Sequence, residues 1–463
     1  MTGDLGGWRT LARRTGIATP LGEVMAIILL CPILLAVPLW NGFPIIFYDT
    51  GAYLAQGILG AYLPERSAVY SLFLKVFGAE TSLWRIGWIQ ALLTSILMVE
   101  FLRVELPRLS LFRTAAVAVL VCTITGIGWY VGQIEPDCFA AITVLALYLL
   151  LFRSRELGAG RNALLVGIAG LAIACHPSNL GLSGGLVLAA GFIFLARKIW
   201  AWLPMPRLSL AVCSFALGLC LVIAANYGYT REIYVSRTGS VFLFARMMQD
   251  GIIKRLLDET CPTAGYEICP YRDRLKPRAD AWLWDNDSPF KTLGGFTGTD
   301  IESGILDREA LKRYPWMNVR AAVIDMVHQF FKFGTGDQIE PQQWVLFGEF
   351  KQVIPSQLAA YIAARQQRER FNFAAMNRLH ITVGAISMAA LAVALILGWR
   401  RRDALKTILP AFVLVALLGN AFVCGVLANP HDRYQSRLVW LPTFVLLVMA
   451  GSFSLRRQAE SGT

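Results

Sequence analysis

Apolar runs of about 20 residues recur along this chain, and they constrain its fold more than any other feature. A helix of that length crosses the roughly 30 Å hydrocarbon core of a membrane. Hydrophobic residues also make up 56% of the 463 positions, more than a soluble domain requires. The sequence therefore predicts an all-α polytopic membrane protein with about ten transmembrane helices. The predicted spans are residues 21–40, 83–102, 113–130, 138–152, 162–175, 180–196, 208–226, 376–398, 407–427 and 438–454.

Basic residues mark alternate connections between these spans, and this pattern sets the predicted orientation. Lys and Arg precede the first span and follow the second, fourth, sixth, eighth and tenth, whereas the connections 131–137 and 176–179 contain neither. The positive-inside rule therefore places both termini in the cytoplasm and these two connections outside. The loops account for the net charge of +12, so it does not indicate a nucleic-acid partner. The first span is interpreted as a retained signal anchor, with a cleaved signal peptide as the alternative.

Two unequal outer segments divide the chain into three predicted regions. An N-terminal transmembrane module, 1–226, carries a first outer loop at 41–82. A long extracytoplasmic segment, 227–375, is expected to form a domain of mixed structure because Gly and Pro residues interrupt it. A C-terminal transmembrane module, 376–463, follows. Within the first outer loop, the short apolar stretch 70–77 predicts a helix that lies in the membrane interface.

Seven of the nine cysteines lie in or beside apolar runs, where cysteine packs as a small hydrophobic side chain. Cys261 and Cys269 differ because they lie close together in the long hydrophilic segment, which faces an oxidising compartment on this topology. We expect a local disulfide between them, since their surroundings do not supply the four ligands of a zinc site. The amphipathic stretches 240–258 and 314–333 are expected to rest on the outer leaflet.

Asp49 follows the first span directly, in the sequence Phe-Tyr-Asp-Thr-Gly-Ala-Tyr at 47–53. A carboxylate among apolar helix ends is poorly solvated and can act as a general base or bind a cation. Alternatively, Asp49 or Thr50 caps a helix that begins near Gly51. The two roles are compatible.

Further ionisable side chains fall in the same outer connections. Arg66, in the turn at 63–67, suits bidentate binding of a phosphate; the alternative is that it snorkels or pairs with Glu65. Glu135 and Asp137 interrupt two apolar helices without a basic neighbour. We expect at least one of them to face a functional site, while Asp137 can also cap the next helix.

The last two outer connections complete the set of candidate residues. His176 and Asn179 form one turn, where a histidine can donate a proton or hydrogen bond, although a lone histidine is more often structural. Arg433 and Arg437 lie one helical turn apart in the last outer loop, so they can anchor a phosphate or pyrophosphate together. The same loop contains His431, Asp432 and Tyr434.

These short motifs resemble those of the GT-C superfamily of integral-membrane glycosyltransferases. The matching pieces are residues 48–54, 64–70, 135–137 and 432–434. The resemblance implies a polyprenyl-phosphate-linked sugar donor and a lipid, glycan or protein acceptor. It also implies a transferase of the cell envelope, expected in the bacterial inner membrane with its active site on the periplasmic face. It names no certain cofactor and leaves a divalent cation open.

By this resemblance Asp49 is the catalytic base, with Glu135 and Asp137 as further catalytic carboxylates. The chain departs from the family pattern because no second acidic residue is adjacent to Asp49, and the segment 227–375 matches no family motif. No metal site made of protein ligands is predicted. The residues expected to bind the substrates are Tyr53, Glu65, Arg66, Tyr70, His176, Asn179, His431, Asp432, Arg433, Tyr434 and Arg437, and the three arginines among them are expected to hold the donor phosphate.

Two other classes of function remain open. A lipid or polysaccharide transporter or flippase would also gather ionisable residues, but it would place some near the middle of its spans. The predicted spans are almost free of such residues, and Glu100, near the inner end of the second span, is the nearest exception. A non-catalytic membrane scaffold explains the long outer segment but not the arginines in the outer turns.

Overall fold

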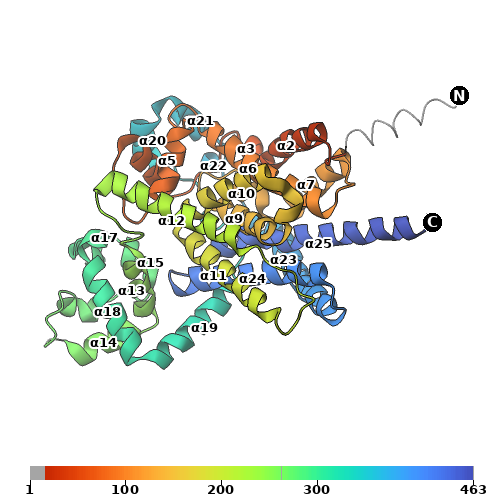
Figure 1. Ribbon diagram of the computed structural model, residues 1–463. Coiled ribbons are helices and arrows are strands. Elements are labelled where there is room, and N and C mark those ends of the chain that lie inside the picture. Colours follow the sequence, from red (N-terminus) through yellow and green to blue (C-terminus); the bar gives the residue numbers. More distant parts are fainter. Residues whose placement is uncertain (1–15, 262, 462–463) are drawn as a thin grey trace.

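The chain folds almost entirely into helices (Figure 1). The computed structural model describes residues 16–261 and 263–461, and these contain no strand, only two isolated β-bridges. Among the described residues, six helical segments are long and apolar enough to cross a membrane, and two apolar helices are shorter. The protein is therefore an all-α integral membrane protein, as predicted. The six long segments are Leu83–Glu105, Cys138–Ala174, Pro177–Ala196, Leu208–Thr230, Phe373–Arg400 and Ala404–Val426; the two shorter helices are Pro20–Leu34 and Leu111–Ile124.

The two predicted membrane modules share one hydrophobic core. Phe101 from the N-terminal module and Phe444 from the C-terminal module both belong to it, and their ring centroids lie 5.4 Å apart. The modules therefore form a single helical bundle. Its helices are α2 (Pro20–Leu34), α3 (Ala36–Asn41), α4 (Thr50–Leu54), η1 (Ala55–Leu59), α5 (Ala68–Val76), α6 (Leu83–Glu105), α7 (Leu111–Ile124), α8 (Ile127–Val131), α9 (Cys138–Tyr148), η2 (Leu149–Arg153), α10 (Ser154–Ala174), α11 (Pro177–Ala196), α12 (Leu208–Thr230), α23 (Phe373–Arg400), α24 (Ala404–Val426) and α25 (Asp432–Ser461).

The first predicted span, 21–40, is broken into two helices. α2 ends at Leu34 and α3 begins at Ala36. Pro38 accounts for the break, because a proline ring clashes with the carbonyl group four residues earlier, here that of Leu34. The shortened α2 has 15 residues, which corresponds to only about 22 Å of helix.

The third predicted span, 113–130, is also divided, into α7 and α8. Thr125 has an extended backbone between them, with φ −138° and ψ 169°. At the next residue, Gly126, an added Cβ atom would lie 2.7 Å from the hydroxyl oxygen of Thr335. The break therefore lies where the long outer segment comes closest to this part of the bundle.

The fourth and fifth predicted spans, 138–152 and 162–175, lie in one helical run that reverses its direction. Gly158 interrupts the run with a φ of +75°, a conformation that glycine adopts without steric cost. Beyond the π-helical turn η2, α10 packs back against α9. As a result Asp137, just before α9, and His176, just after α10, lie at the same end of the bundle.

The long segment 227–375 contains only helices and turns in its described residues, so the mixed structure expected for it is not found. Its first part, 239–314, has a hydrophobic core of its own, and we call this part the satellite cluster. Figure 1 shows it to the left of the bundle, on the side away from the carboxyl-terminal part of α25. Its helices are α13 (Gly239–Gln249), α14 (Ile252–Thr260), η3 (Cys269–Arg274), α15 (Ala279–Trp284), α16 (Pro289–Thr292), α17 (Gly295–Gly298) and α18 (Asp300–Arg313).

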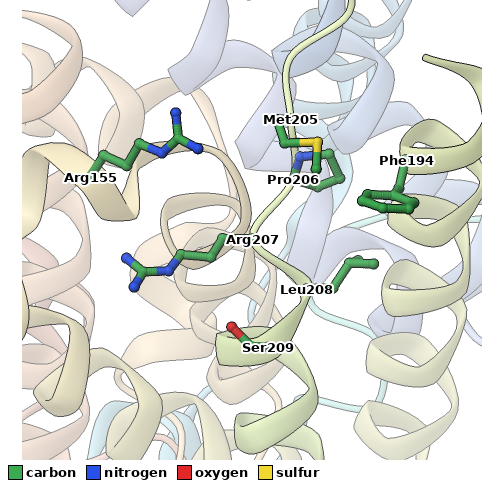
Figure 2. A pocket seen from close by; sticks show the side chains of 7 residues that line it. All are labelled: Arg155, Phe194, Met205, Pro206, Arg207, Leu208 and Ser209. Atoms are coloured by element: carbon green, nitrogen blue, oxygen red, sulfur yellow. The ribbon is translucent and has the colours of Figure 1, made fainter. Parts of the chain in front are cut away.

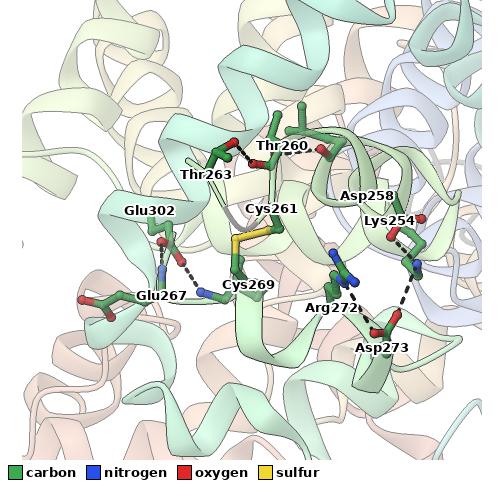
Figure 3. The surroundings of a disulfide bond; sticks show 12 residues. Lys254, Asp258, Thr260, Cys261, Thr263, Glu267, Cys269, Arg272, Asp273 and Glu302 are labelled. Carbon is green, nitrogen blue, oxygen red and sulfur yellow. Dashed lines mark hydrogen bonds and ion pairs between the residues drawn. A yellow bond between two sulfur atoms is a disulfide. The ribbon is translucent and has the colours of Figure 1, made fainter. Parts of the chain in front are cut away.

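A disulfide closes one side of the satellite cluster. Cys261, directly after α14, is bonded to Cys269 at the start of η3 (Figure 3). The backbone amides of Glu267 and Ile268 donate to the carboxylate of Glu302 on α18, at 2.6 and 3.2 Å. The short loop is thus held to α18 as well as to α14.

The second part of the long segment returns to the bundle. Phe350 and Tyr361 belong to the bundle core. The Gln366 side chain accepts from the Ile46 amide at 3.0 Å and donates to the Ile46 carbonyl at 2.6 Å. These contacts tie the segment to the first outer loop. The helices of this part are α19 (Pro315–Phe331), α20 (Gln343–Val353), η4 (Pro355–Gln357), α21 (Leu358–Ala363) and α22 (Arg365–Arg368).

The helices expected at the membrane interface differ in how they use their apolar faces. α5 forms where the 70–77 helix was predicted, and most of its side chains are buried in the bundle core, with Val76 75% exposed at its end. α13 and α14 bury their apolar faces inside the satellite cluster, so the stretch 240–258 has no free apolar face for a leaflet. α19 exposes large apolar side chains, among them Trp316 and Phe331.

Candidate active site

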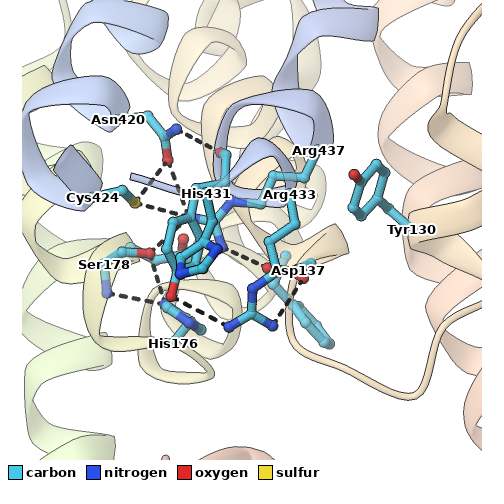
Figure 4. Close-up of polar contacts among 12 residues, drawn as sticks. Tyr130, Asp137, His176, Ser178, Asn420, Cys424, His431, Arg433 and Arg437 are labelled. Atoms are coloured by element: carbon cyan, nitrogen blue, oxygen red, sulfur yellow. Dashed lines mark hydrogen bonds and ion pairs between the residues drawn. The ribbon is translucent and has the colours of Figure 1, made fainter. Parts of the chain in front are cut away.

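Three arginines and two aspartates alternate in a row at one end of the bundle. Arg66 Nη2 donates to Asp49 Oδ1 at 2.6 Å. The other Asp49 oxygen lies 3.8 Å from Arg433 Nη2, and Arg433 Nη1 lies 4.0 Å from Asp137 Oδ2. Arg437 Nη1 donates to Asp137 Oδ1 at 2.7 Å. We call these five residues the charged row; Figure 4 shows Asp137, Arg433 and Arg437 side by side.

The charged row is open at one end and closed at the other. The side chains of Asp49, Arg66 and Arg433 are 18%, 13% and 13% exposed, whereas those of Asp137 and Arg437 are 2% and 0% exposed. Solvent can therefore reach the Asp49 end, while the Arg437 end is enclosed by protein.

Asp49 occupies the position before α4, but its carboxylate does not cap that helix. The neighbouring Thr50 takes up the local hydrogen bonds instead: its hydroxyl accepts from the Phe47 amide at 3.0 Å and donates to the Ile134 carbonyl at 3.1 Å. The capping role considered for Asp49 is therefore not seen, and both of its oxygens face arginines.

Arg66 lies between Asp49 and the satellite cluster. Its backbone amide closes the 63–67 turn by donating to the Leu63 carbonyl at 3.1 Å. Its guanidinium carbon is 5.3 Å from the ring centroid of Trp284, a cation–π contact with the end of α15. Its Nε–H is buried and has no hydrogen-bond partner among the described residues. That donor is available to an anion that enters beside Asp49.

Arg433 and Arg437 project from the first turns of α25, which begins at Asp432. Arg433 lies over the Phe47 ring, 4.3 Å from its centroid, and its Nη2 donates to the Tyr434 hydroxyl at 3.3 Å. The Tyr434 ring also lies 5.5 Å from the guanidinium carbon of Arg437. These aromatic surfaces hold both guanidinium groups in place.

Polar side chains from two neighbouring helices complete the closed end of the row. Arg437 Nη2 donates to the Ser178 hydroxyl at 2.8 Å and to Asn420 Oδ1 at 3.0 Å, and it lies 3.6 Å from Cys424 Sγ (Figure 4). Ser178 lies in the first turn of α11 and Asn420 lies within α24. A buried arginine with this many partners is fixed in one orientation.

Two carboxyl groups of the 131–137 connection are both buried, but their pKa values move in opposite directions. Burial, together with the nearby negative charge of Asp49, raises the pKa of Glu135 well above its usual value. Burial alone would also raise the pKa of Asp137, but the positive charges of Arg433 and Arg437 outweigh it and lower that pKa. Burial and Asp49 therefore favour the protonated form of Glu135, whereas the two arginines favour the ionised form of Asp137.

The charges within the charged row do not cancel. Three guanidinium groups face the two aspartates of the row. One positive charge is left in excess, which favours a singly charged anion.

His176 and Asn179 support the site from outside the charged row. His176 Nδ1 accepts from the Ser178 amide at 3.1 Å and lies 2.7 Å from the Ser178 hydroxyl, so it caps α11. Burial and the neighbouring Arg437 lower the pKa of His176 to about 3, which keeps the ring neutral. The Asn179 amide donates to the Ala172 carbonyl at 2.9 Å and thereby joins the ends of α10 and α11.

His431 and Asp432 connect the site to the long outer segment. His431 Nε2 lies 3.3 Å from Asp280 Oδ2 on α15, and its Nδ1 lies 3.6 Å from Asp337 Oδ2. Asp432 Oδ1 accepts from the Gly334 amide at 2.6 Å. These two residues therefore hold loops together and do not touch the charged row through their side chains.

The other candidate residues pack beneath or beside the site. Tyr53 makes an edge contact with Tyr70, with ring centroids 5.0 Å apart. The Tyr70 hydroxyl donates to Gln90 Oε1 at 2.9 Å, so it anchors α5 to α6. Glu65 is partly exposed, and its side chain forms no ion pair with a described residue. The pairing of Glu65 with Arg66 considered from the sequence is not seen; only its backbone carbonyl accepts from Arg66 Nη1, at 3.4 Å.

Comparison of this chain with protein-family models, curated proteins and solved structures gives no match. Within the described residues, no three His, Cys, Asp or Glu side chains gather as a group that could hold a metal ion.

Several residues of the site were not singled out from the sequence. Asn420 and Ser178 could have been, because a polar residue within or beside an apolar run often marks a functional position. Trp284 and Asp337 lie in the long outer segment, where no local pattern points to the charged row.

Proposed function

We propose that this protein is an integral-membrane glycosyltransferase of the GT-C type, which moves a sugar from a polyprenyl-phosphate donor to a hydroxyl group of a lipid, glycan or protein acceptor. The excess positive charge of the charged row supports this proposal most strongly. A polyprenyl-phosphate-linked sugar is a phosphodiester with a single negative charge, which matches that excess. The prenyl chain can remain in hydrocarbon while the sugar meets water at the end of the bundle.

The donor phosphate takes its place beside Arg66 and Arg433, which both contact Asp49 in the free protein. The unpartnered Nε–H of Arg66 offers a further donor to a phosphate oxygen. The phosphate releases the Asp49 carboxylate from its arginine partners, so that the carboxylate can turn toward the acceptor.

In the transfer step, the acceptor hydroxyl oxygen attacks the anomeric carbon of the sugar. The bond between that carbon and the phosphate oxygen breaks, and its electron pair leaves with the polyprenyl phosphate. Asp49 receives the proton of the attacking hydroxyl and later passes it to water. The leaving phosphate gains a negative charge, which Arg66 and Arg433 stabilise.

Asp137 and Glu135 act as positioning residues in this proposal. Asp137 holds Arg433 and Arg437 at fixed places. The raised pKa of Glu135 favours its neutral form, which does not compete with the donor phosphate for the arginines.

The proposal includes the finer topology expected from the sequence. The chain makes about ten crossings, including the short apolar helices and α25, with both termini in the cytoplasm. The charged row then faces the periplasm of a bacterial inner membrane, and α5 and α19 lie at the outer interface.

Asp49→Asn tests the proposal in membranes supplied with a radiolabelled polyprenyl-phosphate sugar and a native lipid extract as acceptor. We expect the rate of transfer to fall roughly 10²–10⁴-fold, the usual contribution of a general base. Glu80→Gln is the matched control, because it removes an exposed carboxylate from the same outer loop without breaking an ion pair of a described residue, and it should leave the rate unchanged. Normal transfer by correctly inserted Asp49→Asn protein would falsify the role of Asp49 as the base.

A further inference from the structure

A cavity with one basic wall lies at the opposite end of the bundle from the charged row. It has a volume of about 490 Å³ and is lined by residues at the ends of α10, α11 and α12 (Figure 2). α11 begins beside the charged row at Pro177 and ends beside this cavity at Ala196. Its 20 residues correspond to about 30 Å of helix, so the two sites are separated by about the thickness of a membrane.

Two arginines of this cavity differ from their neighbours because they have no acidic partner. Arg155 and Arg207 are exposed, and neither side chain forms a hydrogen bond or ion pair with another described residue. At the same end of the bundle, Arg153 pairs with Glu105, and Arg161 pairs with Glu23 at 2.6 Å. Arg153 and Arg161 are thus paired with carboxylates, whereas the two guanidinium groups of the cavity have no acidic partner among the described residues.

The start of α12 adds further donors to the cavity. Arg207 is the residue before the helix, and no side chain caps the helix there. The first amide groups of α12 therefore point toward the cavity without a side-chain acceptor, at the end of the helix where its dipole favours negative charge. The Ser209 hydroxyl lies in the same wall. Guanidinium groups, free amides and a hydroxyl form a set of donors suited to phosphate oxygens.

The other wall of the cavity is apolar and continues into the lipid-facing surface. Figure 2 shows Phe194 and Leu208 on the side of the cavity away from the two guanidinium groups. Phe194 is 40% exposed, and Val212, one helical turn beyond Leu208 on α12, is 48% exposed. A phosphate bound by the arginines would therefore have an apolar path for its acyl chains beside Phe194 and along α12.

We propose that this cavity binds the phosphate headgroup of an anionic phospholipid, with the acyl chains against the exposed apolar side chains of α11 and α12 beside the cavity. Arg155 and Arg207 contact the phosphate, and the start of α12 contacts its remaining oxygens. Basic cavities between transmembrane helices at the membrane surface recognise lipid headgroups in this way. The site is separate from the charged row and does not depend on a glycosyltransferase activity.

Native mass spectrometry of the purified full-length protein tests the proposal, with phosphatidylglycerol and phosphatidylcholine as probes. We expect the wild-type protein to retain phosphatidylglycerol in preference to phosphatidylcholine. The double variant Arg155→Gln/Arg207→Gln should bind phosphatidylglycerol roughly 25-fold more weakly, about fivefold for each arginine near a membrane surface. Lys198→Gln removes a positive charge from an exposed residue just after α11, outside the cavity, and should leave the affinity unchanged.

Three results would overturn the proposal. The first is equal retention of phosphatidylglycerol by wild type and the double variant. The second is a loss of phosphatidylglycerol affinity in Lys198→Gln as large as that in the double variant, which would mean that only the total charge of this face matters. The third is displacement of the lipid by inorganic phosphate at the same concentration, because the cavity would then bind a free anion without using the apolar wall.

Discussion

At the scale of single residues, the pKa values of the two carboxyl groups of the 131–137 connection are shifted in opposite directions. Burial and the Asp49 charge raise the pKa of Glu135 and favour its neutral form, whereas Arg433 and Arg437 lower the pKa of Asp137 and favour its ionised form. An amide has the shape of a neutral carboxyl group, so it can replace Glu135 but not Asp137. The two positions should therefore respond differently to the same chemical change.

We predict that Glu135→Gln keeps transfer activity and thermal stability close to those of the wild type, and that Asp137→Asn loses both. Asp137→Asn leaves Arg437 buried without its carboxylate, a change that typically destabilises a protein by about 3–5 kcal/mol. Thermal unfolding in detergent and transfer rates in membranes would measure the two effects. Equal sensitivity of the two variants would mean that Glu135 is ionised in the folded protein.

The sequence predicted part of this site for a simple physical reason. Asp49, Arg66 and Arg433 were identifiable because ionisable residues are rare at the ends of apolar runs. The order in which they alternate was not identifiable, since it depends on contacts between segments far apart in the sequence; Asp137 and Arg437, for example, are 300 residues apart. The aromatic contact of Arg66 with Trp284 likewise depends on where the satellite cluster packs.

At the scale of elements, the disulfide is the covalent connection within the satellite cluster. It joins α14 to η3 across a sequence separation of eight residues. Closing so short a loop stabilises a fold by roughly 2–3 kcal/mol in the chain-entropy description. The satellite cluster is small, so this amount is a large share of its stability.

We therefore predict that Cys261→Ser/Cys269→Ser unfolds the satellite cluster at a lower temperature than the bundle. Limited proteolysis with rising temperature would detect cleavage between residues 239 and 314 before cleavage elsewhere. Cys213→Ser, which removes an exposed free cysteine of α12, is the control and should leave the cleavage pattern unchanged. If the satellite cluster and the bundle of the double variant become cleavable at the same temperature, the satellite cluster has no independent stability.

Apolar patterning predicted the existence of most bundle helices but not where they break. The break near Leu34 follows from Pro38, a signal present in the sequence. The break near Gly126 follows from the close approach of Thr335, which no local pattern contains. The long segment shows the same difference between local pattern and tertiary contact. The amphipathic stretch 240–258 was recognised as helical from its local pattern, but its apolar face packs inside the satellite cluster and not on a membrane leaflet.

At the scale of the whole molecule, the satellite cluster is fastened to the bundle by polar contacts near the charged row. Arg246 on α13 pairs with Asp325 on α19, its Nε donating at 2.8 Å. Asn429, just before α25, donates to Asp280 Oδ2 at 2.8 Å. His431 lies between Asp280 and Asp337. The contact of Trp284 with Arg66 depends on this arrangement, so the docking of the satellite cluster should affect the substrate site.

The docking of the satellite cluster on the bundle should weaken as the pH rises, because His431 then loses its positive charge. Burial alone would lower its pKa, but the carboxylates of Asp280 and Asp337 outweigh this effect and raise the pKa to about 9 from 6.5. A group with a raised pKa in the folded state stabilises that state fully below its unfolded pKa, here about 6.5, and loses this contribution as the pH passes 9. The neighbouring carboxylates stay ionised throughout that range, since the pKa values of Asp280 and Asp337 are lowered.

We predict that hydrogen-exchange protection of α15, relative to the intrinsic exchange rate at each pH, falls roughly tenfold or more between pH 6.5 and 9.5. His431→Gln keeps a polar side chain but cannot titrate, so its protection should be lower at pH 6.5 and nearly independent of pH. α6, in the bundle core, supplies the internal reference and should not change. If the wild type and His431→Gln lose protection in parallel, His431 does not hold the satellite cluster in place, and the pH dependence belongs to another group.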